Sequence, residues 1–168
     1  SPLINTGKIG SSINDTNGAE LIKVTATASA VNQVLVANAA TGNAPSITAD
    51  GDDTNVSLIL GSKGTGAVNI NNKVVHREHF MTGDGAVNLT IPLTIFNASS
   101  ALAITMADGV ITGETKYFVN RGTGTATVTI TSLVGTGNPS TVAFAAHEAG
   151  FMMWDGANWH LASKTVAS

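Results

Sequence analysis

The chain has 168 residues, a formal net charge of −3, a charged fraction of 11% and no cysteine. Its eight Lys and Arg residues are scattered singly, which excludes the basic face that nucleic-acid binding requires. No apolar run approaches the length of a membrane-spanning helix, and without cysteine there is neither a disulfide framework nor thiolate chemistry. Because β-branched residues are common and aromatic residues are only 5%, we expect an ordered all-β chain that buries modest apolar faces against copies of itself.

Residues 1–17 mix apolar residues with Gly and Ser and show no alternation of strands and turns. They also lack the basic region and apolar run of a signal peptide. We expect this segment to be an irregular arm that becomes ordered on contact with a partner. Its expected docking residues are Leu3, Ile4, Ile9 and Ile13.

Residues 18–75 repeat a short module, in which a few alternating β residues precede a turn of Gly, Asn, Asp or Pro. Strands are expected at 21–26, 31–37, 46–49, 56–60 and 67–70, with a turn at 50–53. Strands this short bury little surface within one chain, because an isolated hairpin is marginal in water. We therefore expect three chains to wind around a common axis as an intertwined β shaft. The side chains expected at this axis are Leu21, Val24, Val34, Val36, Val56, Leu58, Leu60, Val68 and Ile70.

Two stretches resemble bacteriophage proteins. The sequence NAATGNAPSITADGD at 38–52, followed by VSLIL at 56–60 and GSKGTG at 61–66, resembles the shaft repeat of trimeric phage fibres. The sequence MWDGANWHL at 153–161 is similar to an ending common in phage fibre and head-decoration domains. The resemblance implies a trimeric β shaft on the surface of a virion. The room for only a few repeats favours a short spike over a complete tail fibre.

Residues 76–168 carry most of the aromatic residues and longer strand signals. Strands are expected at 86–91, 102–106, 116–120, 125–131, 141–145, 151–154 and 159–162. Residues 121–124 are expected to turn between two antiparallel strands, and Asp155–Asn158 to close a final hairpin. Residues 99–107 also fit a short helix, but their alternation favours a strand. Short strands at this spacing predict a β-sandwich or barrel-like head.

Two clusters are candidate metal sites. His76, Glu78 and His79 lie at the junction of shaft and head, where three copies on a threefold axis would bring ligands together. A solvated polar joint explains them more simply. The acidic residues of 50–53 and Asn55 offer oxygen ligands for Ca²⁺, but the Gly and Glu of an EF-hand loop are missing. We expect no bound metal and no cofactor.

The remaining candidates are a pair of acid–base residues and a pair of indoles. His147 and Glu148 adjoin aromatic residues, but too few carboxylates lie near an apolar wall to form a catalytic pair. We therefore expect no enzymatic activity. Trp154 and Trp159 are candidate glycan contacts, because indole faces pack on sugar rings, but their place across a tight turn favours a cross-strand pair in the core.

The expected protein is a homotrimeric virion structural protein, a capsid decoration or head fibre on the capsid exterior. Residues 1–17 would dock on the major capsid protein, residues 18–75 would form the shaft and residues 76–168 the projecting head. In the alternative interpretation, the chain is a tail-fibre module whose head binds a bacterial surface glycan. Nucleic acid and membrane are not expected partners.

Overall fold

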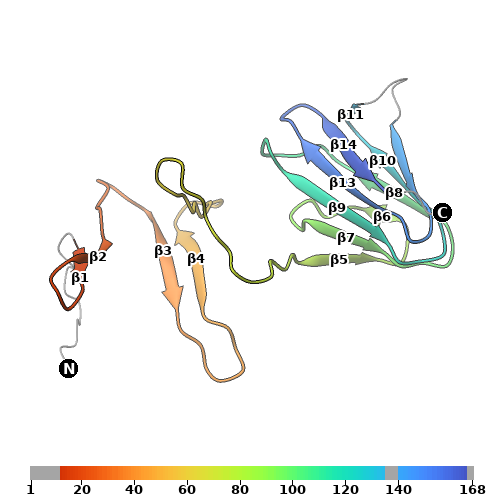
Figure 1. The fold of residues 1–168 in the computed structure, drawn as a ribbon. Helices are drawn as coiled ribbons and strands as arrows, with labels where there is room; N and C mark the ends of the chain where they lie inside the picture. The colour runs from red at the N-terminus through yellow and green to blue at the C-terminus, as the bar shows by residue number, and fades with distance from the viewer. Residues whose placement is uncertain (1–11, 135–139, 166–168) are drawn as a thin grey trace. The chain divides into compact units, whose positions relative to one another are not determined.

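The computed structural model describes residues 12–134 and 140–165, and the fold is all-β, as expected from the sequence. Helices are absent from these residues, so the described part of the chain holds no helix able to cross a membrane. The chain divides into two units, Ser1–Asn69 and Ile70–Ser168 (Figure 1). The boundary lies a few residues before the expected end of the shaft at residue 75.

The first unit contains two antiparallel hairpins. Strand β1 (Ser12–Asn14) pairs with β2 (Glu20–Lys23), and β3 (Asn32–Ala37) pairs with β4 (Ser46–Gly51). The expectation that residues 1–17 are irregular is therefore wrong for β1. Asp15 stabilises the turn of the β1–β2 hairpin, because its carboxylate accepts hydrogen bonds from the N–H groups of Asn17 and Ala19 at 2.8 and 2.9 Å.

Two expected strands of the first unit are missing, and one expected turn is partly strand. Residues 56–60 and 67–70 form no strand, because no segment in the described part of the chain pairs with them. The chain from 50 to 51 belongs to β4 and not to a turn. Gly51 is needed there, since a Cβ at this position would lie 2.3 Å from Oδ1 of Asn32 on the paired strand.

The second unit is a sandwich of two sheets. A four-stranded sheet has the order β12-β10-β8-β6, and a six-stranded sheet has the order β11-β14-β13-β9-β7-β5. The strands are β5 Glu78–Met81, β6 Gly85–Ala86, β7 Leu93–Phe96, β8 Leu102–Met106, β9 Thr115–Asn120, β10 Ala126–Ile130, β11 Leu133–Val134, β12 Thr141–Phe144, β13 Ala149–Trp154 and β14 Trp159–Lys164. We call this unit the head.

The chain of the head winds alternately through the two sheets. From β5 to β13 each strand lies in the other sheet from the strand before it. Strands β5, β7 and β9 are therefore parallel neighbours in one sheet, as are β6, β8 and β10 in the other. Antiparallel β12, β13 and β14 extend the sheets, and β11 lies parallel to β14 at the edge of the larger one. The expected strand at 86–91 is reduced to β6, and β5, β7 and β11 are strands that sequence reasoning did not identify.

The expected hairpin around 121–124 is wrong, because β9 and β10 belong to different sheets. The glycines of 121–124 instead allow the loop that crosses from β9 to β10 to pack against the loop that crosses from β7 to β8. A Cβ on Gly122 would lie 2.2 Å from the Ala98 carbonyl oxygen, and one on Gly124 would lie 1.9 Å from that of Ser100. The close approach permits backbone hydrogen bonds from Gly122 to Phe96 and from Gly124 to Ala98.

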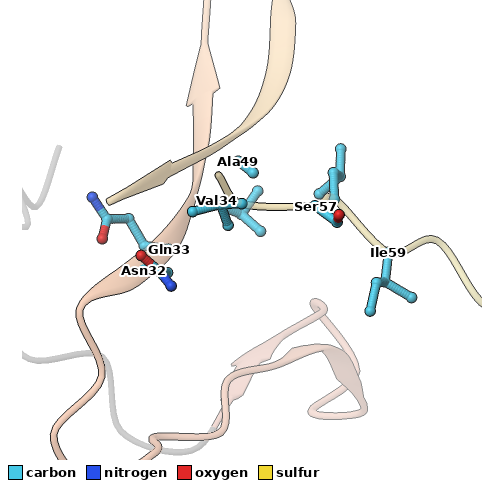
Figure 2. Close-up of a pocket in the computed structure, with 8 residues that line it drawn as sticks. Asn32, Gln33, Val34, Ala49, Ser57 and Ile59 are labelled. Carbon is cyan, nitrogen blue, oxygen red and sulfur yellow. The ribbon is translucent and has the colours of Figure 1, made fainter. Parts of the chain in front are cut away.

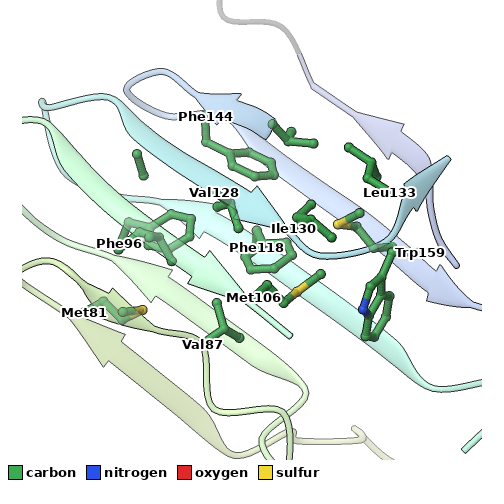
Figure 3. Close-up of a cluster of buried hydrophobic side chains, with 14 of the residues drawn as sticks. Met81, Val87, Phe96, Met106, Phe118, Val128, Ile130, Leu133, Phe144 and Trp159 are labelled. Carbon is green, nitrogen blue, oxygen red and sulfur yellow. The ribbon is translucent and has the colours of Figure 1, made fainter. Parts of the chain in front are cut away.

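The core of the head lies between the two sheets (Figure 3). Strand β8 confirms the strand interpretation of 102–106, because Leu102, Ile104 and Met106 point inward and the residues between them are exposed. Phe118 packs against Phe96 and Phe144 with ring centroids 5.7 and 5.3 Å apart. Full burial of such side chains contributes roughly 1.5–3 kcal/mol each.

A buried asparagine fastens one end of the sandwich. The side-chain Nδ2 of Asn120 donates to the carbonyl oxygens of Gly124, Phe144 and Ala145 at 2.8–3.0 Å, and its Oδ1 accepts from the Gly122 N–H at 3.0 Å. One side chain therefore joins β9, the crossing loop and the end of β12. Because Asn120 is 1% exposed, water cannot replace these hydrogen bonds if they are lost.

Candidate functional site

The β3–β4 hairpin has one apolar face and one polar face. Its register places Val34 opposite Ala49 and Val36 opposite Ile47 on the same face. The other face carries Leu35 among polar residues. Alternation of β residues produces this division, because successive side chains of a strand point to opposite faces. We call the face formed by Val34, Val36, Ile47 and Ala49 the apolar hairpin face.

The apolar hairpin face is exposed within the chain. Val34, Val36 and Ile47 are 56%, 71% and 60% exposed. Large aliphatic groups in neighbouring positions on a two-stranded sheet gain little from pairing alone. The local structure is therefore formed, but the surface that would normally stabilise it is still in contact with solvent.

A hollow of about 390 Å³ lies beside this face, between the hairpin and the segment 56–59 (Figure 2). Its lining brings together Val34, Val56 and Leu58, three of the nine residues predicted at the trimer axis. Ile59 also lines the hollow and is 85% exposed. The segment thus lies near the hairpin without closing over it.

The described residues of the first unit share this exposure. No residue from Ser12 to Phe80 is buried, and the first buried side chain in the described part of the chain is Met81. Of the nine predicted axis residues, Val56 is partly buried and the other eight are exposed. Ile70 falls in the second unit. The predicted docking residue Ile13 lies in β1 and is exposed, whereas Leu3, Ile4 and Ile9 lie outside the described residues.

The acidic residues of the hairpin form hydrogen bonds across its open end. Asn32 donates through Nδ2 to Asp53 Oδ2 at 2.7 Å, and Gln33 donates through Nε2 to Asp50 Oδ2 at 3.1 Å. Among the described residues no group of three His, Cys, Asp or Glu side chains is arranged to hold a metal ion. The candidate Ca²⁺ cluster is therefore better explained as a hairpin clamp.

The junction histidines have separate roles. The ring of His76 stacks on Tyr117 with centroids 5.4 Å apart, and His79 Nδ1 accepts a hydrogen bond from the Asn88 N–H at 3.4 Å. They belong to no metal-ligating cluster in the described part of the chain. Within one chain, His76 contributes an aromatic contact and His79 supports the turn after β6.

Trp154 and Trp159 form a cross-strand pair, and the hypothesis that they contact a glycan is wrong. They face each other in the β13–β14 register, their ring centroids lie 5.5 Å apart, and they are 5% and 0% exposed. Trp159 also donates through Nε1 to the Ala107 carbonyl oxygen at 3.0 Å. A buried indole offers no face to a sugar ring, so the core interpretation holds.

The turn that joins these strands is fixed by Asp155. Hydrogen bonds from His160 and from the backbone N–H groups of Ala157 and Asn158 lower the pKa of Asp155 to about 2. Gly156 has a φ of 103°, a backbone conformation that favours glycine. The ionised carboxylate of Asp155 therefore stabilises the turn.

The candidate acid–base pair is also structural. Glu148 accepts hydrogen bonds through Oε2 from Lys164 Nζ and from the Ala145 N–H, both at 2.7 Å, and it is 4% exposed. His147 has a φ of 65° and points into solvent. The carboxylate thus ties β14 to the end of β12.

Sequence reasoning missed Lys116, which lies almost fully buried in β9. Its Nζ donates to the carbonyl oxygens of Asn88 and Ile91, and burial lowers its pKa to about 8 against the opposing effect of Glu114. The only sequence signal is its position: in the alternation of 116–120 it shares a face with Phe118. Lys116 holds the turn between β6 and β7.

The fold and the exposed surfaces together describe an all-β protein with a packed two-sheet head and an N-terminal unit whose apolar side chains lack cover. No protein-family model matches this sequence, and no curated protein matches it significantly.

Proposed function

We propose that the chain is a subunit of a homotrimeric structural protein on the outside of a bacteriophage particle, where it serves as a capsid decoration or head fibre. The observation that supports this proposal most directly is that no residue from Ser12 to Phe80 is buried. Apolar groups concentrated in a chain segment without a core of its own are typical of surfaces that a partner covers.

Association of identical chains explains this exposure economically. The apolar hairpin face is flat and carries no charged residue, so copies can pack these faces around one axis without burying ions. The small and β-branched side chains of the face suit a narrow shared core. Three copies are favoured because residues 38–66 resemble the shaft repeat of trimeric phage fibres.

The location on a virion rests on the same resemblance. Residues 1–17 would dock on the major capsid protein and the head would project outward. The alternative of a tail-fibre module that grips a bacterial glycan loses the two tryptophans nominated for it, because both are buried. Glu148, one of the two candidate acid–base residues, makes structural contacts with Lys164 and the Ala145 backbone.

The mass of the protein in solution tests the association. Light scattering on the purified chain should give three times the chain mass of 17.0 kDa. A folded monomer at micromolar concentration would refute the proposal. Quantifying the protein in purified virions separates its two forms: a copy number comparable with that of the capsid protein means decoration, and a few copies per particle mean a tail appendage.

A further inference from the structure

The two outer faces of the head differ in chemistry. The outward positions of β8, β10 and β12 carry only alanine and threonine: Ala103, Thr105, Thr127, Thr129, Thr141 and Ala143. Small side chains and hydroxyl groups of this kind are readily solvated. The outer face of the four-stranded sheet thus needs no partner.

The outer face of the six-stranded sheet is apolar and aromatic. The register aligns Phe80, Ile95, Val119 and Ala149 in one row across the sheet, and Leu93, Tyr117 and Phe151 in the next. We call these seven residues the outer aromatic face. Phe80 and Tyr117 are 43% and 36% exposed, and Ile95 between them in the sheet is 7% exposed. The other four residues are partly buried. Two exposed aromatic rings on one sheet face form an apolar surface of the kind that marks an interaction site.

The geometry of the outer aromatic face does not suit a sugar or another small ligand. The Tyr117 ring lies between His76 and Phe151, at centroid distances of 5.4 and 5.0 Å, and the Arg121 guanidinium lies 5.7 Å from the centroid of Phe80. Tyr117 and Phe80 are therefore not free platforms. The hollow beside Tyr117 and Phe151 measures about 220 Å³, below the roughly 300 Å³ at which small-molecule pockets begin.

Two observations favour another copy of this chain as the occupant. First, His76 belongs to the segment 70–77, through which the chain enters the head, and it lies on Tyr117. If three chains associate through residues 18–75, their three entering segments leave a common axis together. The outer aromatic face is therefore continuous along the chain with the proposed association surface, because His76 directly follows the expected end of the shaft at residue 75.

The second observation is charge. Glu78 shares the outer aromatic face with Phe80, and the Arg121 guanidinium lies over the Phe80 ring. Neither residue forms an ion pair within the described part of the chain. Around a threefold axis each copy presents different edges to its two neighbours, so Glu78 of one copy can meet Arg121 of the next.

We propose that the outer aromatic face packs against further copies of this chain, so that the head is itself part of the trimer interface. This inference rests on the proposed threefold association, but it assigns that association a second contact surface outside the shaft. Unlike the Ala/Thr face of the other sheet, this surface is then buried in the assembled protein.

The single tyrosine of the chain, Tyr117, gives a readout confined to this face. We would label the full chain with fluorotyrosine and measure how strongly a soluble paramagnetic agent relaxes the one fluorine signal. Tyr117 should be protected in the trimer. The Phe80→Glu variant should raise its accessibility several-fold, whereas Thr129→Glu on the opposite face should leave it unchanged.

A second variant tests directly whether residue 78 of one copy lies close to residue 121 of the next. In one chain, residues 78 and 121 are two strands and four residues apart, roughly 16 Å at the usual sheet spacings, which is too far for a disulfide. The double variant Glu78→Cys/Arg121→Cys should therefore give disulfide-linked trimers on a non-reducing gel, and neither single variant should.

The outcomes separate this inference from the proposed function. Trimers in which Tyr117 stays accessible and the double variant does not cross-link would overturn the assignment of the face while leaving the trimer itself intact. Protection of Tyr117 only after addition of bacterial surface polysaccharide would also overturn it. A monomer by light scattering would overturn the proposed function first.

Discussion

A glutamate at Val34 should prevent association of the shaft. Val34 is 56% exposed on the apolar hairpin face, so covering it gains about half of the roughly 1.5–3 kcal/mol that full burial of such a side chain provides. Three copies then lose about 3–5 kcal/mol. In addition, each buried carboxylate costs several kcal/mol, so the total penalty is on the order of 10 kcal/mol.

A penalty of this size exceeds what a micromolar trimer can absorb, because each 1.4 kcal/mol changes an equilibrium constant about tenfold. Sedimentation velocity at micromolar concentration should therefore show wild-type trimers and Val34→Glu monomers. The matched control is Thr48→Glu, which places the same charge on the polar face of the same hairpin and should still assemble. Circular dichroism should show that the head folds in both variants. Trimers of Val34→Glu that match wild type would refute the assignment of Val34 to the shared core.

Three further changes have defined outcomes. Asn120→Ala should lower the free energy of unfolding by about 3–5 kcal/mol in denaturant titrations, since several buried carbonyl groups lose their donor; an effect below 1 kcal/mol would mean that water replaces the side chain. The pKa of Lys116 is lower in the folded chain than its usual 10.5, so the unfolded chain binds more protons and stability should rise between about pH 8 and 10.5, by up to roughly 3 kcal/mol. Lys116→Met should abolish that rise, and an unchanged profile would contradict the lowered pKa. Deleting residues 1–17 should leave the trimer intact but prevent capsid attachment in a virion-binding assay; retained attachment would place the docking surface elsewhere.

The fold class and most strands of the head follow from local pattern. Alternation in 102–106 and 126–130 predicted strands correctly, because one side chain in two lies in a packed core. The final hairpin was also predictable, since Asp155 and Gly156 encode its turn within four residues. These features depend only on neighbours in the sequence.

The winding of the head was not predictable from the same signals. The glycines of 121–124 look like a hairpin turn, but they are required by the carbonyl groups of Ala98 and Ser100, which lie more than twenty residues earlier. Strands β5 and β7 are short and pair with strands far along the chain. Likewise, the outer aromatic face becomes visible only when the register aligns Phe80 with Val119.

The absence of paired strands in residues 56–60 and 67–70 has a related cause. These stretches have the β-branched and apolar residues of strands, but within residues 12–134 and 140–165 of one copy no segment pairs with their backbone groups. A sequence pattern indicates that a segment is able to form a strand. The strand forms only where a second segment supplies hydrogen-bond partners for its backbone groups.

The alternate winding of the head also makes it extensible. Each pass through the sandwich adds one strand to each sheet, and its crossing loop rests on the loop of the pass before. A further pass inserted between β8 and β9 would meet the same kind of neighbour on both sides, while β13 and β14 would still close the end. A head built in this way can change height by whole passes without redesign of its first or last strand.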